Sequence, residues 1–255
     1  MNTILIGYAT IIRKEIIRYI RIWPQTTIAP LVTSTLYFLI FGRVIGSRIG
    51  SMNGINYIQF IVPGMIMLQV INISYNNTSS AILSGKYSKS IEELLISPLT
   101  NNAILLGYVT ACLIRSIVIA LLIAIVALFF THLHVTHILL MLVTIIITTT
   151  LFATLGMINA FYAKKFDDIN IIPMFILTPL TYMGGVFYSI KHLPPIWREI
   201  SMLNPIMYTI DIFRYSMLGI ADVNVYVAFS VLFIVTFIAY ATCLYLFKKG
   251  SGIRN

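Results

Sequence analysis

The stretch IVIALLIAIVALFF, Ile117 to Phe130, contains no charged side chain and no side chain that forms a hydrogen bond. Together with the apolar residues before it, this run is long enough to cross the ~30 Å hydrocarbon core of a bilayer as a helix of about 20 residues. The whole chain of 255 residues is 59% hydrophobic and 10% charged, with a mean hydropathy of +0.93. Soluble domains are about 25% charged, so the composition predicts a membrane protein.

Six apolar stretches of suitable length divide the chain. They lie at approximately residues 25–45, 57–81, 103–130, 137–162, 169–190 and 223–247. Residues 1–22 precede them and place isoleucines on one side of a helix and basic residues on the other, which suits a helix at the membrane surface. We therefore predict a single all-α membrane domain over residues 1–255, with six transmembrane helices and an N-terminal interfacial amphipathic helix.

The segment 191–222 is too polar and too interrupted to cross a membrane. Pro194 and Pro195 open one short helix, and Asn204 caps a second helix with Pro205 at its first position. Asp211 and Arg214 are three residues apart and can pair on one face. We predict two short re-entrant or interfacial outer helices before the last span, and the alternative is a folded external loop that covers the bundle.

Lys and Arg are distributed unequally between the two sides of these spans. The N-terminal segment, the gaps at 82–102 and 163–168, and the C-terminal tail with Arg254 hold eleven of the 17 basic residues, whereas the opposite side holds five. By the positive-inside rule, both termini are cytoplasmic. The net charge of +9 is explained by this topology, so we do not expect nucleic acid as a partner.

The stretch SIEELLISPLT, Ser90 to Thr100, falls in one of the cytoplasmic gaps and carries two of the eight acidic residues. Ser90 and Glu93 have the spacing of a capping box, and Pro98 ends the helix soon afterwards. The side chains at 91, 94 and 95 form a short apolar stripe, and Glu92 lies off it. The stretch is either a capped, solvated loop or a helix that docks its stripe into a groove on a soluble partner.

One face of the second span is polar, because Asn72, Asn76, Ser79 and Ser80 recur at helical spacing. Amides facing lipid tails would be costly, so this face contacts either protein or a water-filled path. The fifth span adds Thr178 and Thr181 beside its prolines. The candidate translocation path comprises Asn72, Asn76, Ser79, Thr178 and Thr181.

Apart from Arg43 at the outer end of the first span, Arg115 is the one charged residue inside a predicted span. It either reaches out to the lipid headgroups or pairs with another helix or with cargo. His132, His134 and His137 crowd one outer loop, but acidic and Cys partners are missing there. We expect no metal site and no catalytic site in the chain.

Several blocks of the sequence resemble a known family. The stretch KYSKSIEELLISPLT, Lys86 to Thr100, resembles the first coupling segment of ABC transporter permeases of the type-2 exporter family, in its small bacterial six-span branch. Further blocks follow the family in order over nearly the whole chain. They are IWPQTTIAPLVTSTLYFLIFG (Ile22–Gly42), FIVPGMIM (Phe60–Met67), GGVFYSIKHLPPIW (Gly184–Trp197) and LNPIMYTIDIFRYSMLG (Leu203–Gly219).

The resemblance implies a permease subunit of the bacterial inner membrane that dimerises with a second copy and binds ABC ATP-binding subunits. ATP and magnesium would sit on that partner, and the cargo exported would be amphipathic, lipid-linked or drug-like. The expected coupling residues are Ser90, Ile91, Glu92, Glu93, Leu94, Leu95, Pro98, Lys164, Lys165, Asp167 and Asp168.

The residues themselves favour an external energy source. The Gly85-Lys86 pair lacks the remaining positions of a phosphate-binding loop, so we expect no ATPase site and no bound cofactor in this chain. Acidic residues are missing from the predicted spans, which disfavours the alternative of a gradient-driven secondary carrier or channel acting without an ATPase. A membrane scaffold without transport activity is the third class that we considered.

Overall fold

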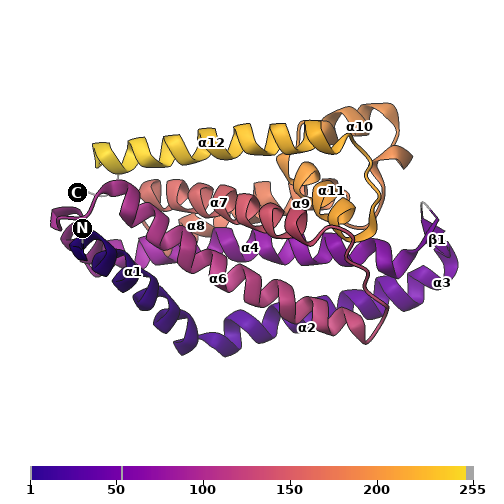
Figure 1. Cartoon of the computed structure of the whole chain (residues 1–255), viewed down its shortest axis with the longest axis horizontal. Coiled ribbons are helices and arrows are strands. Elements are labelled where there is room, and N and C mark those ends of the chain that lie inside the picture. Colours follow the sequence, from indigo (N-terminus) through magenta and orange to yellow (C-terminus); the bar gives the residue numbers. More distant parts are fainter. Residues whose placement is uncertain (1, 53, 251–255) are drawn as a thin grey trace.

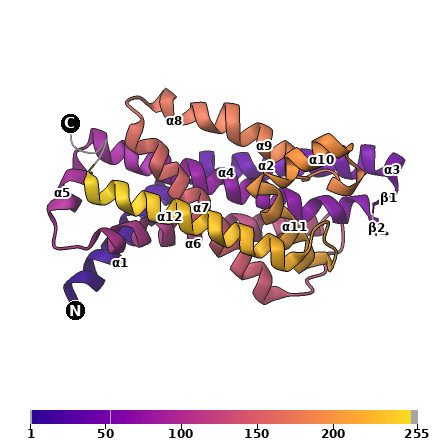
Figure 2. The same ribbon diagram turned by 90° about the horizontal axis from the view of Figure 1, so that it is seen from above.

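A computed structural model of the chain describes residues 2–52 and 54–250 and shows an elongated helical bundle (Figures 1 and 2). Met1 and Arg254, which entered the predictions above, lie outside the described residues. The helical elements are α1 (Asn2–Arg21), η1 (Pro24–Ile28), α2 (Ala29–Tyr37), η2 (Phe38–Ile45), α3 (Gly46–Ile49), α4 (Tyr57–Tyr87), α5 (Ser90–Ile96), α6 (Asn101–Leu128), α7 (Ile138–Tyr162), α8 (Phe166–Ile172), η3 (Pro173–Leu177), α9 (Thr178–Met183), η4 (Ile190–His192), α10 (Pro195–Met202), α11 (Pro205–Leu218) and α12 (Val225–Lys249). A two-stranded antiparallel hairpin, β1 (Ser51–Met52) and β2 (Ile55–Asn56), joins α3 to α4.

Five helical stretches of the described residues are long and apolar enough to cross a membrane. They are Pro24–Ile49, Tyr57–Tyr87, Asn101–Leu128, Ile138–Tyr162 and Val225–Lys249. Each overlaps one of the predicted spans, and the all-α membrane class is confirmed.

The predicted fifth span, 169–190, has different bounds in the structure. The helix there starts earlier, at Phe166, and runs through α8, η3 and α9 to Met183. It ends where Gly185 adopts a φ of +78°, a conformation that favours glycine. Because Asp167 and Asp168 occupy its first turn, this helix is less apolar than the other five. The count of six crossings therefore remains a prediction.

The helix α4 is the centre of the bundle. In its most apolar section 89% of the residues are buried, against 11% in the first stretch, Pro24–Ile49. It packs along α7 and α6, and α11 covers its outer half (Figure 1). The segment from α8 to α9 runs on another side of the bundle, apart from α12 (Figure 2). The polar second span is thus almost enclosed by the rest of the chain.

The contact between α4 and α7 depends on Gly156. A Cβ added at this position would lie 2.6 Å from Oγ1 of Thr78 and still closer to the backbone carbonyl oxygen of Tyr75. Thr78 also donates a hydrogen bond from its hydroxyl to the carbonyl of Ala153, at 2.9 Å. The two helices approach closely because a residue without a side chain faces backbone, as in other membrane helix pairs.

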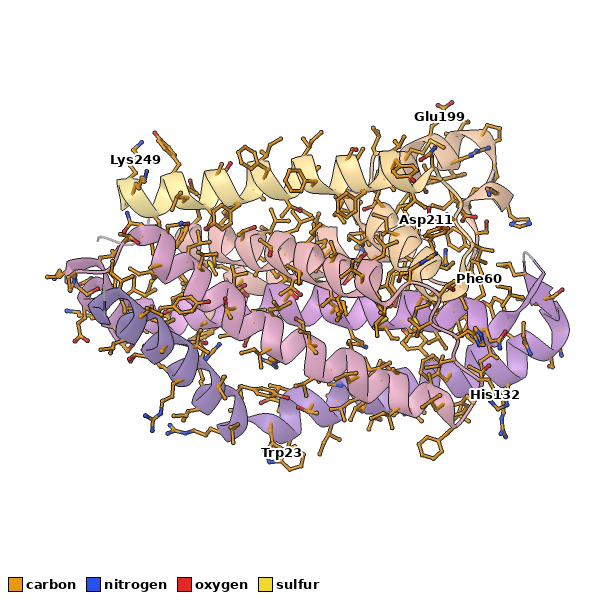
Figure 3. The ribbon with its side chains drawn as sticks, in the orientation of Figure 1. Trp23, Phe60, His132, Glu199, Asp211 and Lys249 are labelled. Atoms are coloured by element: carbon orange, nitrogen blue, oxygen red, sulfur yellow. The ribbon has the colours of Figure 1, made fainter. Side chains whose placement is uncertain are left out.

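The helix α1 packs against α6 and is not merely laid on the membrane surface. Ile11 is buried and contacts α6 at Gly107, where an added Cβ would lie 2.9 Å from Cγ2 of Ile11. Tyr8 bonds Thr110 through its hydroxyl at 2.7 Å. Trp23, at the turn into the next helix, points outward and is 52% exposed (Figure 3). The predicted amphipathic helix therefore exists, and part of its inner face belongs to the bundle.

The outer segment contains the two short helices that we predicted. Asn204 caps α11 by accepting a hydrogen bond from the backbone N–H of Ile206 at 3.0 Å. The predicted pairing of Asp211 with Arg214 is wrong. The carboxylate of Asp211 accepts the backbone N–H groups of residues 222 and 223, whereas Arg214 donates to the carbonyl of Gly185 and lies over the ring of Phe60.

Replacing Gly156 with alanine tests the role of close packing. We expect the Gly156→Ala variant to lose about 1 to 3 kcal/mol of stability, because the new methyl group overlaps backbone atoms of α4. Thermal unfolding of the purified protein in detergent measures this. Ile146→Ala on the exposed face of the same helix is the control. Equal melting temperatures for wild type and Gly156→Ala would contradict the packing argument.

Candidate functional site

The segments predicted to couple to an ATPase gather at one end of the bundle. The helix α5, the start of α8, the first turns of α1 and the end of α12 all lie there (Figures 1 and 2). The outer helix α10 and the hairpin lie at the opposite end. We call the end that carries α5 and the start of α8 the inner end.

The predicted cap of the first coupling segment is displaced by one residue. The residue before the first turn of α5 is Lys89, in a left-handed conformation with φ of +57°, and Ser90 is already helical. The Ser90 hydroxyl accepts hydrogen bonds from Lys14 Nζ and from the Ser88 hydroxyl, so it makes no capping box with Glu93. The capping-box prediction is wrong because the tight turn after α4 is made by Lys89.

The apolar stripe of α5 faces the protein. Ile91 is 2% exposed and lies against Gly85 of α4, and Leu94 and Leu95 pack on the same inner cluster. Glu92 and Glu93 are exposed. The hypothesis that the stripe inserts into a partner is therefore wrong for this conformation. The surface that α5 offers is acidic, with an apolar tip at Ile96, which is 85% exposed.

Lys86 and Tyr87 join the two predicted coupling segments. The ammonium group of Lys86 donates hydrogen bonds to the carbonyls of Ala160, Phe161 and Ala163, at 3.2, 2.9 and 2.9 Å. These carbonyls end α7 and have no partner within the helix, so a cation suits them. Tyr87 donates from its hydroxyl to the carbonyl of Lys164 at 2.7 Å. The loop before α8 is thereby attached to the end of α4.

Asp168 shapes this loop. One of its carboxylate oxygens accepts the backbone N–H groups of Lys164 and Lys165, both at 2.8 Å. The hydrogen bond from Lys164, followed by that from Lys165, holds the pKa of Asp168 below its usual value. The ring of Phe166 stacks on the ring of Tyr87, with the two centroids 5.3 Å apart. The Asp168 side chain thus supports the loop by accepting hydrogen bonds from the loop backbone.

Removing the cation at the end of α7 tests this connection. We expect Lys86→Met to lower stability by about 1 to 2 kcal/mol and to speed amide exchange in residues 159–165, because the last carbonyls of α7 lose their donors. Hydrogen exchange followed by mass spectrometry measures the local effect. Lys89→Met removes a nearby exposed lysine and should leave that segment unchanged. Identical exchange in the two variants would rule out the capping role.

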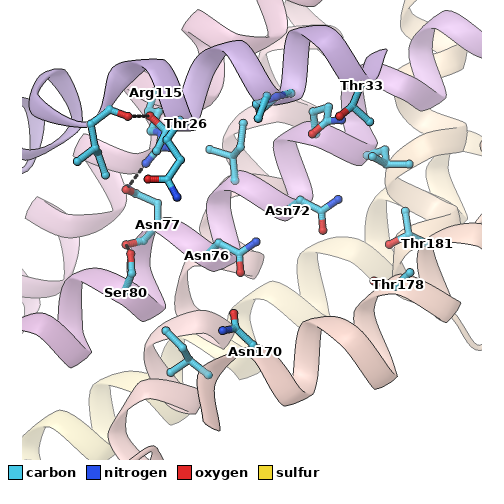
Figure 4. Close-up of a pocket in the computed structure, with 18 of the residues that line it drawn as sticks. Thr26, Thr33, Asn72, Asn76, Asn77, Ser80, Arg115, Asn170, Thr178 and Thr181 are labelled. Carbon is cyan, nitrogen blue, oxygen red and sulfur yellow. Dashed lines mark hydrogen bonds between the residues drawn. The ribbon is translucent and has the colours of Figure 1, made fainter. Parts of the chain in front are cut away.

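A cavity of about 730 Å³ lies between the first helical stretch, α4 and the α8 to α9 segment (Figure 4). Its wall is rich in side-chain amides, namely Gln25, Gln69, Asn72, Asn76, Asn77 and Asn170. Arg115 lies at one end of it, and Thr33, Thr178 and Thr181 lie toward the other (Figure 4). Such a wall offers several hydrogen-bonding groups within an otherwise apolar bundle.

Four of the five predicted path residues line this cavity: Asn72, Asn76, Thr178 and Thr181. Ser79 does not, because its hydroxyl is buried and bonds the carbonyl of Asn76 at 3.2 Å. Sequence spacing placed Ser79 on the same face, and the structure turns it inward. The neighbouring Asn77 and Ser80 line the cavity instead.

A second polar face of α4 holds the bundle together. Ser74 bonds the hydroxyl of Ser116 on α6 at 3.1 Å, and Thr78 bonds α7. The two interpretations of the polar second span, helix pairing and cavity lining, thus apply to different residues of the same helix. The sequence argument missed Ser74 and Thr78 because single hydroxyls in an apolar run give a weak signal.

Arg115 does not extend to the bilayer surface. It is 7% exposed, donates from Nη1 to Oδ1 of Asn77 at 2.5 Å and lies 4.6 Å from the ring centroid of Tyr19. The first alternative, a headgroup-contacting arginine at the lipid surface, is therefore wrong. Arg115 faces the bundle and pairs α6 with α4 and α1.

The chain matches the family model described as ABC-2 type transporter over residues 7–218. It is 44% identical over 255 residues, the full length of both chains, to the inner membrane transport permease YadH of Escherichia coli K12. It is also 25% identical over 229 residues to nodulation protein J of Rhizobium leguminosarum bv. viciae, covering 87% of this chain and 88% of that protein.

Nodulation protein J of Neorhizobium galegae is 23% identical over 234 residues, covering 91% of this chain and 89% of that protein. The blocks from Ile22 to Gly219 that carry the resemblance to type-2 permeases lie almost entirely within the matched region. The expected family is confirmed, and the chain belongs to the ABC-2 type transporter family as a membrane permease.

Proposed function

We propose that the chain is the permease subunit of an ATP-driven exporter in the bacterial inner membrane, with both termini in the cytoplasm. An ABC ATP-binding subunit supplies the energy and carries the ATP and magnesium. The cargo is amphipathic, lipid-linked or drug-like. The observation that carries this proposal is the acidic surface of α5, which is exposed at one end of the bundle and anchored directly to α4.

The anchoring makes α5 suitable for receiving mechanical work. Ile91 contacts Gly85, and Leu94 and Leu95 pack in the inner cluster with side chains of α1, α4, α6, α7 and α12. Force on the exposed carboxylates of Glu92 and Glu93 therefore reaches several long helices. The loop Lys164–Asp168, tied to α4 through Tyr87, is the second contact that we propose.

A second copy of the chain completes the proposed transporter. Asn76 is exposed at the cavity wall, and the stretch Pro24–Ile49 beside it is mostly unburied. An amide in contact with lipid tails would be costly, so this side suits a second copy that encloses a shared path. Two copies about a two-fold axis are the simplest arrangement.

In the proposed cycle, closure of the two ATPase subunits moves both coupling segments. The helices attached to them reorient, and the cavity lined by Asn72, Asn76, Thr178 and Thr181 changes its access from one side of the membrane to the other. The alternative, a gradient-driven carrier or channel, is disfavoured because the described residues of the cavity wall include amides and one arginine and no carboxylate.

Charge reversal on α5 tests the docking surface. We expect Glu92→Lys combined with Glu93→Lys to reduce recovery of the ATP-binding subunit with the purified permease by about tenfold or more, since steering by carboxylates becomes repulsion. Pull-down of the co-expressed subunit measures this.

Glu199→Lys on α10 makes the same chemical change at the opposite end of the bundle (Figure 3) and serves as the control. Full recovery with the double variant would remove the basis for docking at α5.

Replacing the two cavity amides tests the path. We expect Asn72→Leu with Asn76→Leu to abolish transport-dependent ATP hydrolysis while the complex still assembles, because the cavity loses its polar wall. ATPase stimulation in proteoliposomes measures this.

Gln59→Leu, on the same helix but outside the cavity, is the matched control. Undiminished stimulation in the double variant would exclude this cavity as the route, and flux without any ATPase subunit would support the gradient-driven alternative.

A further inference from the structure

The inner part of the cavity brings two guanidinium groups to one amide. Arg115 of α6 and Arg18 of α1 both donate to Oδ1 of Asn77, at 2.5 and 3.1 Å, and Arg18 also donates to the backbone carbonyl of Asn77. These residues are far apart in the sequence and are brought together by the packing of α1 on α6 and α4. Figure 4 shows Arg115 and Asn77 at the cavity wall.

The charges at this site do not balance. Glu15 is the carboxylate present, and its Oε2 accepts from Nε of Arg18 at 2.9 Å and lies 2.7 Å from Nη2. Glu15 is 6% exposed, and its carboxylate is paired with Arg18. Among the described residues, Arg115 donates a hydrogen bond to the neutral amide oxygen of Asn77 and lies over the ring of Tyr19. One positive charge remains without a carboxylate among these residues.

Arg115 is buried and incompletely bonded. It is 7% exposed, it lines the cavity, and its Nε has no hydrogen-bond acceptor among the described residues. A guanidinium carries five N–H donors, and a buried charge without a partner is costly in a membrane helix. An anion in the cavity beside the guanidinium group would supply the missing charge.

The rest of the wall favours an anion attached to an apolar body. Asn76 lines the cavity beside Asn77 and adds a second amide, whereas the Ser80 hydroxyl already donates to the carbonyl of Asn77 and accepts from Arg18. Leu68 and Ile73 line it as well and offer apolar surface. An arginine with neighbouring amides suits the tetrahedral oxygens of a phosphate group, because guanidinium donors match that geometry.

We propose that Arg115, with Asn77, forms a binding site for the phosphate-class headgroup of an anionic amphiphile. This inference rests on the proposed function, since it names the chemical class of the cargo that enters the cavity. Arg18 and Glu15 act as positioning residues, because they orient Asn77 and set the local charge.

Binding of radiolabelled dodecyl phosphate to the purified permease in a neutral detergent tests the site. We expect Arg115→Gln to weaken binding by about tenfold or more, as a charge-assisted hydrogen bond is lost. Arg115→Lys should retain part of the affinity. Glu15→Gln should strengthen binding several-fold, because it removes the negative charge and still accepts a hydrogen bond from Arg18. Arg198→Gln, exposed on α10, is the control and should bind as wild type does.

The opposite signs expected for Arg115→Gln and Glu15→Gln separate a binding site from a structural one. If Arg115 served only to hold helices together, both variants would lower the melting temperature, and they would not change dodecyl phosphate binding in opposite directions. That result would overturn the proposal. Equal binding of dodecyl phosphate to wild type and Arg115→Gln would overturn it as well.

Competition identifies the source of the anion. Displacement by excess inorganic phosphate at similar affinity would support the anion site but point to free phosphate as the ligand. Displacement by dodecyl phosphate alone, with no effect of dodecanol, supports the amphiphile. These binding measurements need no ATPase subunit. A negative binding result therefore does not affect the docking test on Glu92 and Glu93, and a negative docking result does not affect the binding measurements.

Discussion

The bundle is organised by the need to keep the polar groups of α4 out of contact with hydrocarbon. No solvent is available in a bilayer core to satisfy an amide or a hydroxyl, so each must find a partner in protein or in a water-filled space. The helix α4 carries such groups on two faces, and 89% of its most apolar section is buried. The surrounding helices α6, α7 and α11 therefore cover it, and the remaining side opens onto the cavity.

The same helix links the cavity to the inner end. With 31 residues, α4 is about 46 Å long at 1.5 Å per residue. Asn72 and Asn76 lie on its cavity side, whereas Gly85 supports Ile91 of α5 and Lys86 closes the end of α7. In the proposed cycle, a displacement of α5 would move α4 or break these contacts, because Ile91 packs closely against Gly85.

Sequence patterns predicted the elements far better than the direction in which single side chains point. Helices at the long apolar runs and after the Asn204-Pro205 pair are determined by residues close together in the sequence. The structure places helices at these positions. The stripe of α5 was correctly identified as apolar, but neither a solvated loop nor docking into a partner describes it, because spacing cannot tell which surface covers the stripe. Ser79 was placed in the cavity by periodicity alone, whereas its side chain is buried in the bundle. The sequence left two alternatives for Arg115 and could not decide for helix pairing, because its partners, Asn77 and Tyr19, come from other helices.

The two ends of the cavity differ in chemistry, and this difference restricts what the cavity accommodates. At the inner end, Arg115 and Asn77 provide charge and hydrogen bonds. At the other end, Tyr37 and Tyr182 bond through their hydroxyls at 3.2 Å, and both rings lie near Phe187. Aromatic rings offer apolar contact but no net charge. A molecule that satisfies both ends must therefore be polar at one end and apolar at the other.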